Sequence, residues 1–540
     1  MSLWLNLFSL MKLTLAFMLS TALAVAATFT RDLPSPAGAD SQCSNLSAAP
    51  DGTLHLTWSA PSPTVAGERA LFLATLPPDA VAWSAPRVIV STSLLMENWA
   101  DFASLAVGTD GALTAQWFQK PAGSADAHGY DGWFARSTDR GATWGKPAPL
   151  GHEFVALAPL SGGRTLAVWL QSTRVADPHA APRAKRDPSA PRPARDPAAP
   201  YAPSMKLLAR LLAPDGSALG EWTVDPDVCT CCQNTVATLS GDRVFVGYRG
   251  HTADEIRDNK YAIFNLDQRT WSAPKAIHDD GWKIAACPVN GPAADARGGA
   301  YAVAWFTAAE GQPRVFARYA VDTDKSFGPV VRLDLGKPMG RIETVLLADQ
   351  SALFLWMEIG TADNAAGIYA RRLFGDGALS SAQLVTDSTQ ARTSGFPRAA
   401  LRPTGAVVMS FTQAGTPHQV RTLEFDPAAL GRAPASRSVS LNSRPSALSS
   451  ISPEFCIAPI VAFHQLYRHE PIQENPRPPA ARHRRPGCRL GRRHQACGKI
   501  RSGCAPRPPR RHHRRARARI RPLGETRGNP RRDARHDDGV

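Results

Sequence analysis

Residues 136–147 read RSTDRGATWGKP, a stretch whose residue types are those of a tight, self-bonded turn. The side chains of Ser137 and Asp139 can accept hydrogen bonds from backbone N–H groups, and Gly141 can adopt a conformation that other residues avoid. Trp144 can anchor the turn to the sheet beside it. Weaker forms of the pattern recur at residues 74–86 (ATLPPDAVAWSAP), 264–274 (FNLDQRTWSAP) and 320–329 (AVDTDKSFGP). This recurrence indicates that the turn belongs to a repeated unit.

A short apolar segment that ends in an aromatic residue repeats along the same part of the chain. The aromatic residues are Trp58, Trp117, Trp169, Tyr248, Trp305, Trp356 and Phe411. They are spaced by 59, 52, 79, 57, 51 and 55 residues, and the one long interval contains a Pro/Ala/Arg-rich insertion at residues 174–204. One strand-like segment precedes each aromatic strand and two more follow it. The sequence therefore predicts repeated units of four short strands.

Four short strands that recur at this period are typical of a propeller blade. We therefore predict an all-β fold, a β-propeller of six or seven four-stranded blades over residues 43–430. The last unit shows only three strands, and a strand at residues 28–33, within an N-terminal arm of residues 28–42, would complete it. A β-sandwich array is the alternative, although it does not require one aromatic strand in every unit.

The first 27 residues have the pattern of an export signal. Lys12 precedes an apolar run over residues 13–26, which ends in the small-residue pattern Ala24, Val25, Ala26. The run is shorter than a bilayer-spanning helix, and Met11 is an alternative start. We expect a secreted or periplasmic protein that has no membrane span once the signal is removed.

The positive charge of the chain is concentrated in its last part. The formal net charge is +16, and residues 451–540 hold 21 Arg and 1 Lys against 7 acidic residues. We expect residues 431–540 to be a disordered Arg/Pro-rich tail, because so little apolar content cannot form a core. A basic arm and a frame-shifted translation of GC-rich DNA are both consistent with this composition. No nucleic-acid partner is expected, because an exported protein rarely meets nucleic acid and the repeated units end before the tail.

The turn at residues 136–147 resembles the Asp box, or BNR repeat, of the sialidase superfamily. In that superfamily the box is architectural and lies away from the active face of a β-propeller. The resemblance implies a glycoside hydrolase that removes terminal sialic acids without a metal or other cofactor. It also implies three arginines that hold the substrate carboxylate, a tyrosine paired with a glutamate as nucleophile, and an aspartate as acid/base.

Propeller connectivity brings the loops between blades, and those between second and third strands, to one face. Carried over from the resemblance, Asp101 corresponds to the acid/base and Glu255 to the partner of the tyrosine. Arg257 and Arg341 correspond to two of the carboxylate clamps, for which guanidinium groups are well suited. Further substrate-binding candidates on this face are His152, Glu153 and Asp258.

Two features of the superfamily have no counterpart in this chain. No Arg-Ile-Pro motif precedes the first unit, and no tyrosine of the last units falls on the candidate face, since Tyr369 reads as a third-strand residue. Two functions therefore stay open. One is an exo-glycosidase or glycan-binding protein that acts on a glycan or another small anionic ligand, and the other is a non-catalytic propeller that binds a partner.

Cysteines form a separate constellation on the same face. Cys229, Cys231 and Cys232 lie in the motif CTCC, and Cys287 follows Cys232 by 55 residues, which is one repeat. Cys232 and Cys287 should therefore occupy equivalent places on neighbouring blades. A disulfide is the expected use of these thiols in an oxidising compartment. The alternative is a metal site for copper or zinc, because thiolates bind both ions.

Overall fold

The computed structural model describes residues 29–121, 129–173, 201–321 and 326–433, all of which belong to one compact unit. The expected export signal at residues 1–27, most of the insertion at 174–204 and nearly all of the tail at 431–540 lie outside these residues. The helices of the described part are four single 3-10 turns, none of which has the length of a membrane-spanning segment. They are η1 (Ser161–Gly163), η2 (Ala309–Gly311), η3 (Arg392–Ser394) and η4 (Pro427–Ala429).

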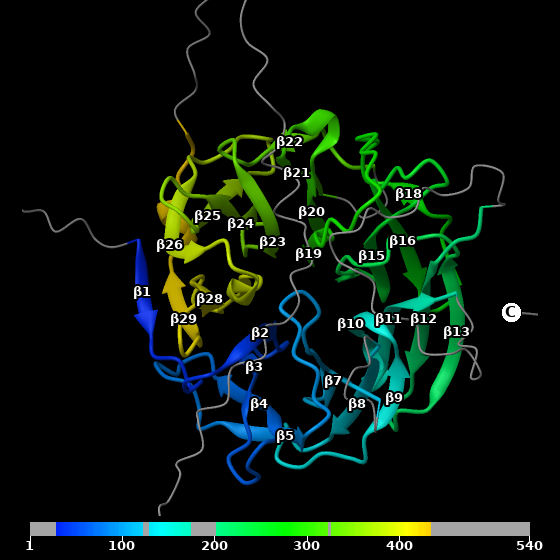
Figure 1. Cartoon of the computed structure of the whole chain (residues 1–540), viewed down its shortest axis with the longest axis vertical. Helices are drawn as coiled ribbons and strands as arrows, with labels where there is room; N and C mark the ends of the chain where they lie inside the picture. Colours follow the sequence, from blue (N-terminus) through cyan, green and yellow to red (C-terminus); the bar gives the residue numbers. More distant parts are fainter. Residues whose placement is uncertain (1–28, 122–128, 174–200, 322–325, 434–540) are drawn as a thin grey trace, which may run out of the picture. The chain divides into compact units, whose positions relative to one another are not determined.

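Seven antiparallel sheets follow one another around a central axis and form a seven-bladed β-propeller (Figure 1). The first blade contains β2 (Gln42–Ala48), β3 (Leu54–Pro61), β4 (Arg69–Leu76) and β5 (Arg87–Thr92). The second contains β6 (Ser104–Val107), β7 (Leu113–Gln119), β8 (Asp131–Ser137) and β9 (Ala148–Gly151). The third contains β10 (Glu153–Pro159), β11 (Thr165–Ser172), β12 (Met205–Leu212) and β13 (Ala218–Asp225).

In the fourth blade the outermost strand is divided into two short pieces that pair with the same neighbour. This blade contains β14 (Thr235–Leu239), β15 (Arg243–Arg249), β16 (Asn259–Asn265), β17 (Thr270–Trp271) and β18 (Lys275–Ala276). The fifth contains β19 (Ala293–Arg297), β20 (Ala300–Thr307), β21 (Arg314–Ala320) and β22 (Val331–Arg332). The sixth contains β23 (Pro338–Leu346), β24 (Ala352–Ile359), β25 (Ala365–Leu373) and β26 (Gln383–Thr389).

The seventh blade joins the two ends of the described chain. Its strands from the C-terminal side are β27 (Arg398–Leu401), β28 (Val407–Gln413) and β29 (Gln419–Phe425), and its outermost strand is β1 (Thr30–Leu33). β1 pairs antiparallel with β29, so that Thr30 lies opposite Phe425, and the two strands lie side by side in Figure 1. The expected strand at residues 28–33 is therefore confirmed, and the number of blades is seven.

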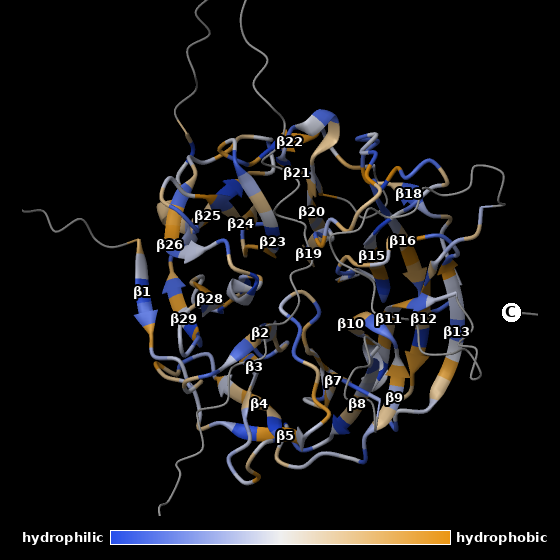
Figure 2. Cartoon of the chain, in the orientation of Figure 1, coloured by the Kyte–Doolittle hydropathy of each residue, from blue (hydrophilic) through white to orange (hydrophobic). Residues whose placement is uncertain are grey.

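All seven aromatic residues of the repeat lie on the second strand of their blade. None of them is more than 5% exposed. Second strands lie between two strands of their own sheet and between two neighbouring blades, so both of their faces are covered and their sequences read as continuous apolar runs. The hydrophobic clusters accordingly lie between blades; one joins Val168 of the third blade to Val246 and Tyr248 of the fourth. Outer strands such as β13 and β26 are exposed and mix hydrophilic with hydrophobic residues (Figure 2).

The turn at residues 136–147 connects β8 to β9, the third and fourth strands of its blade, as expected. Asp139 accepts hydrogen bonds from the hydroxyl of Ser137 at 2.7 Å and from the backbone N–H of Thr143 at 2.9 Å. The Ser137 hydroxyl oxygen accepts from the N–H of Gly141, whose φ is +80°. Trp144 packs against the hydrophobic cluster of the first and second blades. These contacts close the turn on itself and anchor it to its blade, as its residue types predict.

First strands line the axis, and their bulges determine which residues face it. The first strands of neighbouring blades contact each other around the whole ring. Three of them, β2, β10 and β23, carry a register shift close to the axis, and a non-glycine residue with positive φ lies within each shift. These residues are Cys43, Phe154 and Arg341. Because a bulge adds a residue to one strand, it turns the side chains that follow it toward a different face.

Candidate functional site

A cavity of about 180 Å³ lies where the seven first strands meet. Every blade contributes at least one residue to its wall. The polar residues of the lining are Asn45, Ser47, Asp101, Ser104, Gln233, Asn234, Thr235, Glu343 and Arg398. Rings of Phe102, Phe154 and Phe396 complete the wall. The cavity therefore combines carboxyl, amide and guanidinium groups with apolar faces.

Asp101 is held in this wall by two donors to one oxygen. The Tyr130 hydroxyl donates to Oδ2 at 2.7 Å, and the backbone N–H of Phe154 donates to the same atom at 2.8 Å. The side chain is almost fully buried, and this burial, assisted by the nearby charge of Glu153, raises the pKa of Asp101 well above its usual range although both hydrogen bonds oppose the shift. With Oδ2 serving twice as acceptor, the proton of the acid form belongs on Oδ1.

Glu343 and Arg398 form an ion pair on another part of the wall, with Nη1 and Oε2 2.6 Å apart. Arg398 also donates to Oδ1 of Asn45 at 2.9 Å, and its guanidinium lies over the ring of Phe102. Burial raises the pKa of Glu343 to about 7, although the charge of Arg398 opposes this rise. The second carboxyl group of the cavity therefore changes its protonation near neutral pH.

Of the candidate site residues predicted from the sequence, only Asp101 lines the cavity directly. His152 and Glu153 lie beside it: Nδ1 of His152 is 2.6 Å from the carbonyl oxygen of Tyr130, and burial raises the pKa of Glu153. Glu343 was not nominated, although it lies two residues after Arg341. The register shift at the start of β23 accounts for this difference, because it brings Glu343 rather than Arg341 to the axis.

Arg341 and Asp258 have structural partners outside the cavity. Arg341 donates from Nη1 to the carbonyl oxygens of Ala391 and Gly395, at 3.0 and 3.2 Å, and lies over the ring of Trp99. The Asp258 carboxylate accepts from the backbone N–H groups of Gly281 and Trp282. The structure therefore does not bring Arg341 together with Arg257 as a pair of clamps on the cavity wall.

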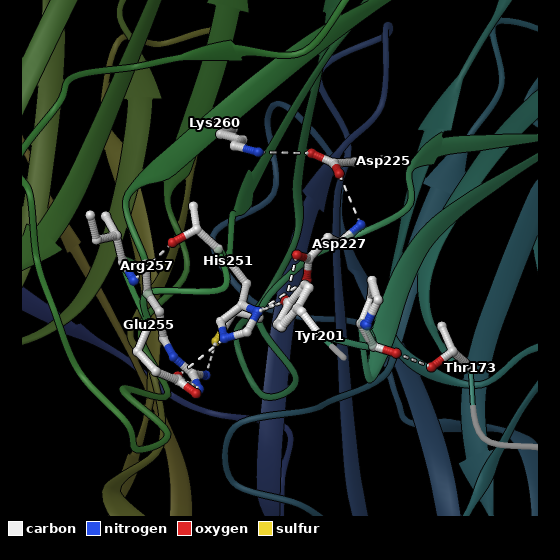
Figure 3. A network of polar contacts seen from close by, with 12 residues as sticks. Thr173, Tyr201, Asp225, Asp227, His251, Glu255, Arg257 and Lys260 are labelled. Atoms are coloured by element: carbon white, nitrogen blue, oxygen red, sulfur yellow. Dashed lines mark hydrogen bonds and ion pairs between the residues drawn. The ribbon is translucent and has the colours of Figure 1, made fainter. Parts of the chain in front are cut away.

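Glu255 and Arg257 lie on the loop that precedes β16 and belong to a second polar group, which also includes Asp227 from the loop before β14 and Tyr201 from the segment before β12 (Figure 3). His251 is central to it: Nδ1 lies 3.0 Å from Asp227 and 2.7 Å from the Tyr201 hydroxyl, and Nε2 lies 3.1 Å from Glu255. Arg257 donates to Glu255 at 2.7 Å. Burial opposes ionisation of Glu255, but the hydrogen bonds from Arg257 and His251 lower its pKa.

The thiols of the CTCC motif are next to this polar group, in contact with Arg257. Arg257 donates from Nη1 to Sγ of Cys229 at 3.2 Å. Sγ of Cys229 is 3.9 Å from that of Cys231 and 3.8 Å from that of Cys232, and Sγ of Cys287 lies 3.8 Å from the hydroxyl of Thr230. All the cysteines of the described chain are free thiols, and these separations exceed the ~2 Å of a disulfide bond. Hydrogen bonds from Cys231 and Cys232 lower the pKa of Cys229, and one from Cys231 lowers that of Cys287 to about 7.

One loop connects the thiols to the cavity. Gln233 and Asn234, which line the cavity, follow Cys232 immediately. Gln233 donates to the carbonyl oxygen of Ala100 at 2.6 Å, next to Asp101, and accepts from the N–H of Gly291 at 3.0 Å. Asn234 donates to the carbonyl oxygen of Phe154 at 2.8 Å. One peptide bond therefore joins Cys232 of the thiol cluster to Gln233 of the cavity wall.

Tyr201, Asp227, Glu343 and Arg398 are among the site residues that the sequence did not indicate. Tyr201 precedes His251 by 50 residues, and no motif or period connects them. For Glu343, the available signal was its place in the segment GRIE at the start of a first strand. If a bulge is assumed in this segment, the alternation of strand faces predicts that Glu343 points to the axis.

Comparisons with known proteins support no finer assignment. The sequence matches no protein-family model and no curated protein. Among solved structures, it is similar to a protein of unknown function from Dyadobacter fermentans (14% identity, 74% of this chain and 99% of that one, TM-score 0.39). It is also similar to a Penicillium chrysogenum alpha-L-arabinanase (11%, 75% and 98%, TM-score 0.36) and to the phage phi92 endosialidase (10%, 78% and 72%, TM-score 0.40). Similarities at this level say nothing about the activity of this chain.

Proposed function

We propose that the central cavity binds a sugar residue of a glycan and that the protein hydrolyses a glycosidic bond there. The observation that carries this proposal is the presence of two buried carboxyl groups, Asp101 and Glu343, in one cavity wall that also offers amides and phenyl rings. A sugar presents hydroxyl groups in its plane and C–H groups on its faces, so it needs both kinds of partner. Hydrolysis of a glycoside generally needs one carboxyl group as acid and a second as base or nucleophile.

The different surroundings of Asp101 and Glu343 assign the acid role to one carboxyl group and the base role to the other. Asp101 has its pKa raised well above the usual range and is therefore the proton donor to the leaving oxygen. Glu343, with a pKa raised to about 7, is ionised in part at neutral pH and accepts the proton of the attacking water. The water oxygen forms the new bond to the anomeric carbon as the bond to the leaving oxygen breaks. Tyr130 positions Asp101 through Oδ2 and leaves Oδ1 to deliver the proton.

The test is a panel of fluorogenic glycosides that includes a sialoside, because the Asp-box resemblance implies one. Asp101→Asn should lower kcat by about 10²- to 10⁴-fold, as expected for the loss of a general acid. Glu343→Gln should have an effect of similar size. The control is Asp267→Asn, the same chemical change at an exposed turn of the fourth blade, which should keep full activity.

Binding is measured separately on a glycan array with wild type and with Asp101→Asn. Binding without turnover would support the alternative of a glycan-binding propeller. The proposal fails if wild type neither cleaves nor binds any glycan, or if Asp267→Asn loses as much activity as Asp101→Asn.

A further inference from the structure

The cluster formed by Cys229, Cys231 and Cys232 is close to the geometry of a metal-thiolate centre. Their three sulfur atoms all lie within 4.8 Å of one another, and two of the separations are 3.8 and 3.9 Å. Three sulfur atoms placed about 2.3 Å from a common ion are about 3.8 Å apart if the centre is tetrahedral and about 4.0 Å apart if it is trigonal. Two of the three separations therefore match those around a single bound ion, and the third is within 4.8 Å.

The charges around the cluster favour an anionic centre. Arg257 contacts Cys229 from one side. Arg249, which is 2% exposed, donates its hydrogen bonds to the carbonyl oxygens of Arg257, Asn290 and Phe306, which are neutral. Its positive charge is therefore not balanced by these partners, and a buried charge without compensation is costly. Three thiolates around a monovalent or divalent cation carry a net negative charge and would compensate it.

The surroundings also offer a route for the ion and a further ligand. Cys229 and Cys232 are buried, whereas Cys231 and Cys287 are partly exposed. Cys287, on the loop before β19, has its sulfur 3.8 Å from the hydroxyl of Thr230, the residue between Cys229 and Cys231. An ion can therefore reach the cluster from the side of Cys231, and Cys287 is the nearest thiol for a fourth position.

From this geometry we infer that Cys229, Cys231 and Cys232 bind one thiophilic d¹⁰ metal ion, either Cu(I) or Zn(II). Soft thiolate ligands select these ions. A three-thiolate set satisfies trigonal Cu(I), whereas Zn(II) prefers a fourth ligand and would recruit Cys287. The ion would fix residues 229–234, the loop that supplies Gln233 and Asn234 to the cavity. This inference is independent of any glycan chemistry.

The experiment uses the full chain, reduced, stripped of metal with a chelator, and kept anaerobic. Zn(II) and Cu(I) are added in separate arms, and bound metal, free thiols and thermal stability are measured in each. We expect one ion per chain in at least one arm, protection of three thiols from a thiol reagent, and a higher Tm than that of the metal-free protein. In the Zn(II) arm, Cys287 should be the fourth protected thiol.

Variants test which cysteines hold the ion. Cys229→Ser and Cys232→Ala should each weaken metal binding at least tenfold. Cys43→Ser is the matched control, because Cys43 is a free thiol of the first blade whose sulfur contacts the carbonyl oxygen of Asn98, and it should bind metal as wild type does. The thiol-protection measurement needs no variant, so it decides the question even if one variant does not fold.

Three results would overturn the inference. The first is that wild type binds neither ion at a stoichiometric level. The second is that Cys43→Ser loses as much metal as Cys229→Ser. The third is that protein purified without reductant is metal-free and two of the three thiols are lost together as a disulfide. None of these measurements involves a glycan, so they test the metal site even if the proposal for the cavity is wrong.

Discussion

Tyr130 donates a 2.7 Å hydrogen bond to Oδ2 of Asp101 in the wall of the central cavity. Tyr248 of the fourth blade makes a contact of the same kind with Oδ2 of Asp225 of the third blade, at 2.8 Å and away from the cavity lining. These two tyrosine–aspartate pairs therefore have nearly equal geometry in different surroundings. One can be altered as a control for the other.

Replacing Tyr130 by Phe should remove the bond to Asp101 and keep the packing of the ring against Phe118. Because the lost bond lowers the pKa of Asp101, this pKa should rise further. A loss of about 1 kcal/mol in the free energy of unfolding is expected, since Oδ2 keeps its bond from Phe154. Carboxyl-carbon NMR titration and urea unfolding provide the two measurements.

Tyr248→Phe is the control for this change. It should lower stability by a similar amount and leave glycan binding and turnover unchanged, because Tyr248 does not line the cavity. Equal effects of the two variants on ligand binding would contradict the assignment of the cavity as the ligand site.

The raised pKa of Glu343 should make stability depend on pH. The folded state retains the proton of this group up to about pH 7, against a reference value of 4.5. The folded state therefore binds more protons than the unfolded state in this interval, and the free energy of unfolding falls as pH rises through it. The full effect is roughly 3 kcal/mol. Glu343→Gln has no proton to lose and should lack this contribution.

Urea unfolding of wild type and Glu343→Gln at pH 4.5, 6 and 7.5 measures this effect. As pH rises, wild type should lose free energy of unfolding relative to Glu343→Gln. Glu310→Gln, at an exposed residue, should follow wild type at each pH. Parallel curves for wild type and Glu343→Gln would show that burial does not hold the proton on Glu343.

The fold could be predicted because its main determinant repeats. A buried aromatic residue on each second strand is required wherever two blades pack together, so seven copies of one physical constraint appear in the sequence. The closing strand could be predicted as well, because a last unit of three strands leaves one edge unpaired. A single architectural turn, at residues 136–147, was enough to place the third and fourth strands of its blade.

The candidate site could be predicted only in part. Asp101 and the four thiols were identified because connectivity brings their loops to one end of the axis. Glu343 was missed because a one-residue bulge, which follows Gly340 in β23, exchanges the faces of the strand. Tyr201 and Asp227 were missed because their contacts with His251 join loops whose relative placement the sequence does not encode locally.

Gly291 should be needed for its lack of a side chain. A Cβ atom on this residue would lie 1.9 Å from the carbonyl oxygen of Gln233, so the two loops that carry the cavity wall could not keep their distance. We expect Gly291→Ala to cost about 3 kcal/mol of stability, the upper part of the range for overpacking. Gly38→Ala, where no atom lies within 4 Å of the added Cβ, should be nearly neutral.

Thermal unfolding of the two glycine variants, with glycan binding as a second readout, gives the measurement. Gly291→Ala should also weaken binding, because Gln233 lines the cavity. Equal Tm values for the two variants would contradict this prediction, because they would mean that the loops carrying Gln233 and Gly291 can move apart without loss of stability.

The closure of the ring by β1 should make stability sensitive to one residue near the amino terminus of the described chain. Leu33 is 3% exposed and packs with Leu54 and Val408, which belong to the first and last blades. Leu33→Ala leaves a cavity in this contact and should cost about 2 to 4 kcal/mol. Val88→Ala, at an exposed position of an outer strand, should change stability by less than about 0.5 kcal/mol. Because the blades bury their apolar faces against each other, loss of this contact should lower the midpoint of one cooperative transition in urea. A separate early transition in Leu33→Ala, with the main midpoint unchanged, would instead mean that β1 lies on a ring that is already closed without it.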